Sequence, residues 1–350
     1  MEIHKLKNIK GLWIFVVPIS GLKLTPAINY EITINKITFV SREKLPRIRK
    51  RLGFTLKISD LIKSRPLSLK KFFNDVNTFA IYQAGGTAEA NENVFMDLVR
   101  DELNILSLSQ LGYGRRRNNA ALTVSNEKRT GSLAYFMFQA RDKSWVLENK
   151  VSGRFMVLTL DKNWKEYQKE FSFFYELISI MKGEKDISDG WRQDIVNAAI
   201  LCGQSQSSSD LPQAFLWNMI AIETLLTHRG DSYSTELPKR VEAFIGWTNN
   251  WKVENYHKRI SDIYKKRSAF VHAGKTNDID IHDLLFTDNL LVNIFYNILK
   301  HISLFSCKKS LIDFSKKVEA EYLLGIKSKV RPKTIQFLSM QYSDKDYKNV

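Results

Sequence analysis

An arginine and a histidine five positions apart have the residue types best suited to chemistry in this chain. Arg267 and His272 belong to residues 264–275, where apolar residues at 3.6-residue spacing predict a helix that ends near Gly274. Arg267 falls on the otherwise apolar face of that helix, and a buried arginine requires an acid or a phosphate as its partner. Arginine binds phosphate oxygens through a planar fork of donors, and histidine exchanges protons near neutral pH. The pair therefore suits reactions at a phosphate ester.

The helix predicted over residues 215–226 places a carboxylate among aliphatic side chains. Glu223 shares one face with Leu216, Met219 and Ile220. One inward acid and one inward arginine on separate helices favour pairing, so we predict an ion pair between Glu223 and Arg267. Two interpretations of Arg267 stay open at this point. Its burial serves either a polar contact that fixes the helix register or a catalytic site.

Five helix positions correspond to a rotation of about 140°, so Arg267 and His272 leave an ideal helix in different directions. The two side chains can then act together in one of two ways. Either the site forms across a seam between two copies of the chain, or the last helical turn at Ala273 and Gly274 is unwound. The C-terminal end of a helix also favours an imidazolium, which would suit His272 as an acid.

Two groups of basic residues are candidates for contacts with a nucleic-acid backbone. The first flanks the Arg267 motif, and the second is a triple arginine in a loop bordered by glycines. The group that flanks the motif is Lys265, Lys266 and Lys275, and the triple arginine is Arg115, Arg116 and Arg117. Each cation could bind a phosphate. The alternative for both groups is an exposed surface whose charges only solubilise the protein.

The first part of the chain mixes strand and helix patterns and predicts an α+β domain over residues 1–162. Segments 12–19 and 28–40 are rich in β-branched residues, and 89–111 carries a helical apolar face. Two further strands are predicted, over 133–139 and 155–160, with Trp145 and Val146 in the connection between them. Basic residues before segment 12–19 resemble a secretion signal, but no small-residue cleavage site follows, which favours a buried strand.

Strand patterns stop after Trp164, and amphipathic helices with short connections follow. This arrangement predicts an all-α antiparallel helical bundle over residues 163–326. Asp210 and Pro212 have the residue types of a helix start, with Asp210 as the cap and Pro212 in the first turn. Residues 327–350 form a basic, polar tail that we expect to be loosely held.

Bulk composition limits the class of protein. The chain has 350 residues, with 53 Lys and Arg against 37 Asp and Glu and a net charge of +16, which favours a polyanionic partner such as nucleic acid. Its two cysteines are too few for a disulfide framework or a zinc site, so we expect no metal, no cofactor and a reducing cytoplasm. No apolar run reaches the roughly 20 residues that span a bilayer, so no membrane is expected.

A helix containing Ala-Ile-Glu-Thr-Leu-Leu, followed by one that ends in Arg-Ser-x-x-Val-His-x-Gly, resembles the HEPN superfamily and specifically its Apea-like branch. The resemblance covers residues 189–305. It implies a metal-independent endoribonuclease that forms a homodimer or a higher oligomer through this bundle. The active site would lie where two bundles dimerise, with Arg267 and His272 as catalytic residues. The position after the arginine is often Asn, Asp or His in this superfamily. Here it is Ser268, which can hydrogen-bond a phosphate but is a poor acid or base.

The resemblance also suggests RNA as the substrate and a role in bacterial defence or as a toxin. RNA cleavage without metal follows when the 2′-hydroxyl attacks the adjacent phosphate, which requires a base, an acid and a cation for the phosphorane charge. The alternative function is a non-catalytic module that uses the same bundle and basic surface to bind nucleic acid or to dimerise.

Overall fold

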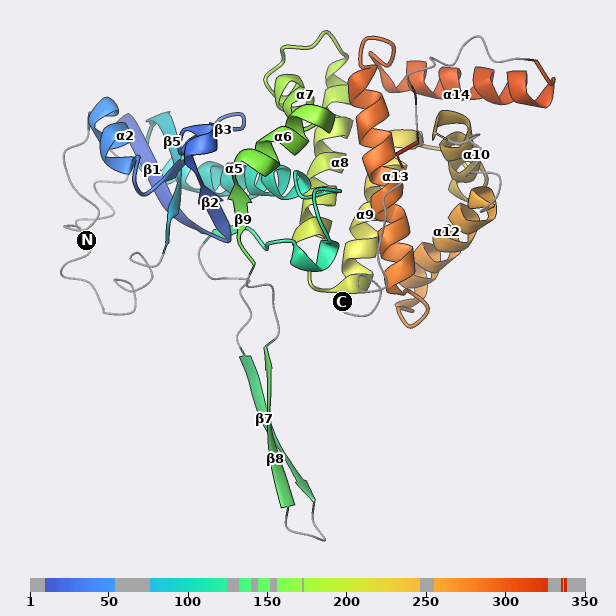
Figure 1. The fold of residues 1–350 in the computed structure, drawn as a ribbon. Helices are drawn as coiled ribbons and strands as arrows, with labels where there is room; N and C mark the ends of the chain where they lie inside the picture. The colour runs from blue at the N-terminus through green and yellow to red at the C-terminus, as the bar shows by residue number, and fades with distance from the viewer. Residues whose placement is uncertain are drawn as a thin grey trace. The chain divides into compact units, whose positions relative to one another are not determined.

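The structure is a computed structural model that describes residues 10–53, 76–124, 132–139, 144–151, 156–171, 173–245, 255–326, 335, 337 and 338. The chain divides into two compact units (Figure 1). Unit 1 comprises Met1–Leu103 and Asn118–Lys162, and unit 2 comprises Asn104–Arg117 and Asn163–Val350. An N-terminal region built on an antiparallel sheet is therefore followed by a helical region, as the sequence predicts at this level.

Unit 1 is built on a five-stranded antiparallel sheet. Its strands, in spatial order, are β3 (Glu31–Thr33), β4 (Thr38–Ser41), β5 (Thr78–Gly86), β1 (Gly11–Ser20) and β6 (Thr123–Val124). The longest pairing joins β1 to β5, from Gly11 opposite Gly86 to Ile19 opposite Thr78. The β-branched and aromatic residues of β1 pack well on such a surface, so the predicted strand over 12–19 is confirmed.

Two helices cover opposite faces of this sheet. In α2 (Leu45–Arg51), Ile48 packs with Val40 and Ile81 in a buried cluster. Successive strand residues point to opposite faces, so Tyr82 lies on the other side. There it stacks on Phe95 of α5 (Ala88–Leu108), with ring centroids 6.1 Å apart. The sheet thus has an aliphatic contact on one face and an aromatic contact on the other.

A buried carboxylate on α5 holds the turn between β3 and β4. Glu102 accepts hydrogen bonds from the backbone N–H groups of Asn35, Lys36 and Ile37, at 2.8 to 3.1 Å for the shortest bond from each. Burial raises the pKa of Glu102, and these donors offset only part of that effect. The single strand predicted over residues 28–40 is wrong, because this anchored turn interrupts it.

Unit 1 has two further strand pairs. The parallel pair is β2 (Leu22–Leu24) with β9 (Leu158–Leu160), and the antiparallel pair is β7 (Ser132–Gln139) with β8 (Ser144–Val151). Trp145 and Val146 lie inside β8, not in a connection between strands as the sequence suggested. Their residue types, an aromatic and a β-branched one, fit a strand.

Unit 2 contains the end of α5 and a series of helices. In chain order these are α6 (Lys162–Phe171), α7 (Phe173–Met181), α8 (Asp189–Ser207), α9 (Leu211–Leu226), α10 (Tyr233–Ile245), α12 (Tyr256–Ala273), α13 (Ile281–Lys300) and α14 (Lys308–Leu323). Asp210 caps α9 by accepting the Gln213 N–H at 3.0 Å, with Pro212 in the first turn, as predicted. Each such cap satisfies a backbone donor that a helix start leaves free.

The centre of unit 2 is α13. Every residue from Asp283 to Leu299 is buried, and the helix packs against α7, α9 and α10 (Figure 1). The buried polar side chains of this helix, such as Asp288, Asn293 and Asn297, form hydrogen bonds within the unit. The helix α12 packs against α9 and α10. Among the described helices, none has the length and apolar character needed to cross a membrane.

Candidate active site

The helix α12 positions the two residues that the sequence singles out. It begins after Asn255, whose side chain accepts the Lys258 N–H, and continues without interruption to Ala273. Gly274 closes it with φ of 63°, and the N–H of Lys275 donates to the Ala269 carbonyl across the glycine. The last turn is thus not unwound. Because α12 is regular, Arg267 and His272 leave it in different directions.

Arg267 forms the ion pair that the sequence predicts. Its Nη2 donates to Oε2 of Glu223, in α9, at 2.7 Å. The side chain of Arg267 is 17% exposed and that of Glu223 is 6% exposed, so the contact between α12 and α9 is mostly buried. Desolvation and attraction oppose one another in such a pair, and the acid holds the guanidinium in one orientation. The pair therefore positions Arg267 whatever its further role.

The pair is not saturated with hydrogen bonds. Within the described part of the chain, Oε1 of Glu223 and Nε of Arg267 are buried without a partner. Nη1 of Arg267 is not buried and donates to no residue that the structure describes, so it accounts for part of the exposed surface of this side chain. Burial raises the pKa of Glu223, and the neighbouring Arg267 offsets part of that effect. The outer edge of the guanidinium is thus available to an anion.

A tyrosine completes the surroundings of the ion pair. The Tyr264 ring lies one helical turn before Arg267, with its centroid 5.9 Å from the guanidinium carbon, within the range of a cation–π contact. Burial raises the pKa of Tyr264, and the negative charge of Glu223 adds to that effect. The hydroxyl therefore stays protonated at neutral pH and can serve only as a neutral donor or acceptor.

His272 occupies the last turn of α12 with an exposed side chain. It makes no hydrogen bond or ion pair with any residue that the structure describes. Ser268, next to Arg267, is half-buried, and its hydroxyl likewise forms no hydrogen bond with a described residue. The structure thus brings Glu223, Arg267 and Tyr264 together, while His272 points to solvent from a different side of the helix.

The basic residues around the motif differ in their availability. Lys266 donates to Asp283 at 2.7 Å, where Asp283 is also part of the box that caps α13. Lys265 is exposed and approaches Asp262 at 3.1 Å, an exposed pair that contributes little stability. Lys275 is exposed. Lys265 and Lys275 are thus accessible to an anion, and Lys266 shares its charge with an acid.

The triple arginine does not form a single phosphate clamp. Arg116 is buried, with its Nη1 2.5 and 2.6 Å from the two carboxylate oxygens of Asp288 and its Nη2 donating to the carbonyl and hydroxyl of Ser205. Its guanidinium is not accessible to a nucleic acid, which corrects the expectation for this residue. Arg115 is half-buried, and the side chain of Arg117 lies outside the described residues.

The buried partner of Arg116 receives further hydrogen bonds. Oδ1 of Asp288 accepts the side-chain amides of Gln206 and Asn218 at 2.9 and 2.8 Å. These donors satisfy a carboxylate that would otherwise be buried with one partner. Nothing in the local sequence distinguishes Arg116 from its neighbours, because Asp288 lies 172 positions away. The apolar stretch around Asp288 was the signal that could have suggested a buried cation.

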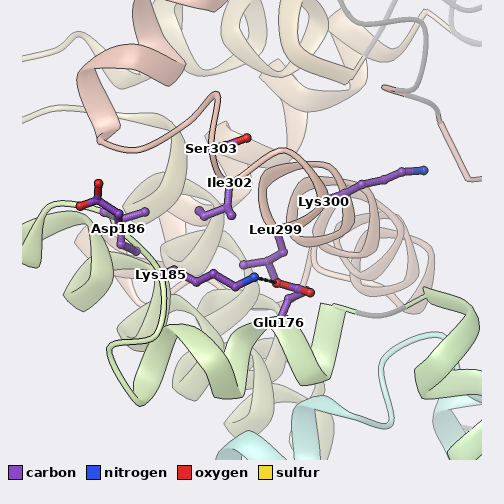
Figure 2. A pocket seen from close by; sticks show the side chains of 8 residues that line it. Glu176, Lys185, Asp186, Leu299, Lys300, Ile302 and Ser303 are labelled. Atoms are coloured by element: carbon purple, nitrogen blue, oxygen red, sulfur yellow. Dashed lines mark ion pairs between the residues drawn. The ribbon is translucent and has the colours of Figure 1, made fainter.

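A surface pocket of about 490 Å³ lies elsewhere in unit 2, between α7 and the end of α13. Figure 2 shows its lining, which contains none of the predicted site residues. The ion pair of Lys185 with Glu176, at 2.7 Å, crosses it, and Leu299 and Ile302 supply an apolar wall. Its charges thus neutralise one another. No cluster of three metal-ligating side chains exists among the residues described.

Comparisons with models of protein families, with curated proteins and with solved structures find no match to this chain. The likeness of the helical unit to a HEPN bundle thus stays a prediction from the sequence.

Proposed function

We propose that the chain is a metal-independent endoribonuclease of the HEPN type, with Arg267 and His272 as its catalytic residues. The observation that supports this most is the buried contact of Glu223 with Arg267, which leaves one edge of the guanidinium at the surface. An exposed histidine follows five positions later on the same helix. A fixed cation and a free imidazole are the groups that phosphodiester cleavage without metal requires.

In the proposed reaction the 2′-hydroxyl of RNA attacks the adjacent phosphorus and the bond to the 5′-oxygen breaks. His272 accepts the 2′-hydroxyl proton, and a second imidazolium donates a proton to the leaving 5′-oxygen. The products are a 2′,3′-cyclic phosphate and a 5′-hydroxyl, so atoms and protons balance. Arg267 donates to the phosphorane oxygens through its outer edge. Ser268 supports the phosphate as a hydrogen-bond donor.

Two copies of the chain supply the two imidazoles in this proposal. Because α12 is regular through its last turn, one copy does not direct Arg267 and His272 to the same side. Val271, beside His272, has 48% of its surface exposed, which suits a contact with a second copy. Exposed Lys265 and Lys275 would bind the flanking RNA backbone. A role in bacterial defence or as a toxin belongs to the same proposal.

The test is incubation of the purified protein with RNA in the presence of EDTA. We expect cleavage that survives chelation and yields cyclic-phosphate ends. Arg267→Ala and His272→Ala should each reduce cleavage by about a hundredfold or more, the usual effect of removing a general acid–base group or a donor to the transition state. His257→Ala is the matched control, because His257 is exposed near the other end of α12. Retained activity in either motif variant contradicts the proposal.

The second candidate is a non-catalytic nucleic-acid-binding or dimerisation module. It is favoured by the pairing of Arg267 with Glu223, since that contact also has a purely structural explanation. This function predicts salt-dependent RNA binding by the wild-type protein without any cleavage. It also predicts that His272→Ala leaves RNA affinity unchanged.

A further inference from the structure

The last described residues of the chain contact α13 through the backbone. Asn293 is a buried residue of α13, and its Oδ1 accepts the Leu338 N–H at 2.5 Å while its Nδ2 donates to the Leu338 carbonyl at 3.0 Å. One side-chain amide thus binds the donor and the acceptor of one residue, as a neighbouring strand would. We propose that Asn293 is the centre of a site that binds a peptide backbone, occupied in this chain by its own Leu338.

Side chains next to Leu338 contribute a second contact. The ring of Phe337 lies 5.6 Å from that of Tyr256, the first residue of α12, and Ile335 is buried. Tyr256 in turn stacks on Phe286 of α13, with centroids 5.5 Å apart and ring planes 11° from parallel. The ring of Phe337, tilted by 53° to that of Tyr256, thus packs against an existing pair of stacked rings. The site therefore selects a segment by its backbone and by one aromatic side chain.

The site needs an N–H donor from its occupant. Nδ2 of Asn293 also donates to the Asn289 carbonyl, at 2.8 Å, and keeps that partner if the segment leaves. For Oδ1, the N–H of Leu338 is the one donor among the described residues. A buried acceptor without a donor is unfavourable, so an empty site would have to admit water or another peptide. A residue that lacks an N–H at position 338 should not be held.

Occupation of this site affects the helix that carries the candidate catalytic residues. Phe337 contacts the first turn of α12, and Asn293 belongs to α13, so the segment fastens the start of α12 to the central helix. This contact of the C-terminal residues with α12 and α13 is independent of ribonuclease activity.

The first test measures amide hydrogen exchange in the full-length protein. The Leu338 N–H should be protected in the wild type, and Asn293→Ala should accelerate its exchange by about tenfold or more, since one hydrogen bond is lost. Asn218→Ala is the control, because Asn218 is also a buried amide of unit 2 but donates to the side chains of Thr287 and Asp288. An unprotected Leu338 amide, or equal exchange in both variants, overturns the proposal.

The second test asks whether the site accepts the segment from outside. A full-length Leu338→Pro protein lacks the N–H and should release its own tail. A synthetic peptide of residues 331–342 should bind this protein, and a Leu338→Ala peptide, which keeps the N–H, should bind as well or slightly more weakly. The Leu338→Pro peptide should not bind, and a Leu338→Pro protein that also carries Asn293→Ala should bind none of them. Failure of the first peptide to bind, with exchange in α13 unchanged from the wild type, overturns the proposal.

Discussion

At the scale of single residues, the contact of Glu223 with Arg267 combines two opposing effects. Burial in α9 disfavours the carboxylate, and the guanidinium 2.7 Å away favours it, with burial the larger effect on the pKa of Glu223. Such a pair contributes little net stability but defines one geometry for the arginine. In a catalytic site, this pair would orient the guanidinium of Arg267. It also makes the free energy of unfolding depend on pH.

Glu223→Gln should reduce the dependence of the free energy of unfolding on pH. An acid whose pKa is raised in the folded chain contributes stability at low pH that is lost as the pH rises through that raised value. The free energy of unfolding of the wild type should therefore fall, relative to Glu223→Gln, from about pH 4.5 upward, by at most about 1.4 kcal/mol per pH unit. Urea denaturation between pH 4 and 8 measures this difference.

Asp231 should show the opposite dependence of stability on pH, because its pKa is lowered and not raised. Hydrogen bonds from Arg240 lower its pKa to about 2, so its contribution is complete at neutral pH and is lost as the pH falls toward that value. Asp231→Asn should therefore lose stability relative to the wild type at neutral pH and approach it in acid. A wild-type stability that rises with pH relative to Glu223→Gln would contradict the assignment for Glu223.

At the scale of elements, α8 approaches the end of α5 so closely that only glycine fits between them. A Cβ added to Gly203, in α8, would lie 1.8 Å from the carbonyl oxygen of Asn104 in α5. The atoms that this Cβ would meet belong to the backbone of a regular helix, α5. Such atoms cannot move aside as the end of a flexible side chain would. The requirement for glycine here thus arises from contact between helices, and the backbone of Gly203 itself is ordinary.

Gly203→Ala should lower the free energy of unfolding by about 3 kcal/mol or more, the upper range of overpacking penalties. Gly190→Ala is the matched control, because Gly190 is in the same helix and an added Cβ would meet nothing within 4 Å. Its substitution should be neutral or stabilise by up to about 1 kcal/mol, since alanine is the better helix former. Equal effects of the two substitutions in chemical denaturation would contradict the close approach.

At the scale of the whole molecule, the helical unit is not continuous in sequence. The segment Asn104–Arg117 belongs to it, although residues 118–162 return to the sheet unit. Arg116 makes this segment an integral part of the unit, because its buried guanidinium is the counter-ion of Asp288 at the centre of α13. A boundary placed in the sequence between residues 162 and 163 would separate these two charges.

Arg116→Ala should destabilise the helical unit by about 3–5 kcal/mol, because it leaves the Asp288 carboxylate buried without a cation. Lys265→Ala, which removes an exposed cation whose pair with Asp262 is also exposed, should change stability by about 0.5 kcal/mol or less. Circular dichroism during urea denaturation reports the loss of helix in both variants. A small effect of Arg116→Ala would mean that Asp288 is protonated or hydrated in the absence of the arginine.

Much of the local structure followed from the sequence because its causes are local. The strand β1, the cap of α9 at Asp210 and the closure of α12 at Gly274 each depend on residue types a few positions apart. The ion pair of Glu223 with Arg267 was also predictable. Each of the two charged residues lies on an apolar helix face. When these faces pack together, the opposite charges are buried and pair.

The remaining features depend on contacts between distant parts of the chain, and only the tertiary structure decided them. Glu102 interrupts the strand predicted over residues 28–40, Arg116 is buried against Asp288, and Asn293 holds Leu338. No local pattern encodes these contacts, because each depends on which donor lies within about 3 Å after the helices and strands have packed. The amino-acid sequence by itself thus determined the elements and the charges they carry. Packing decided which of those charges are buried with a partner and which stay free to act.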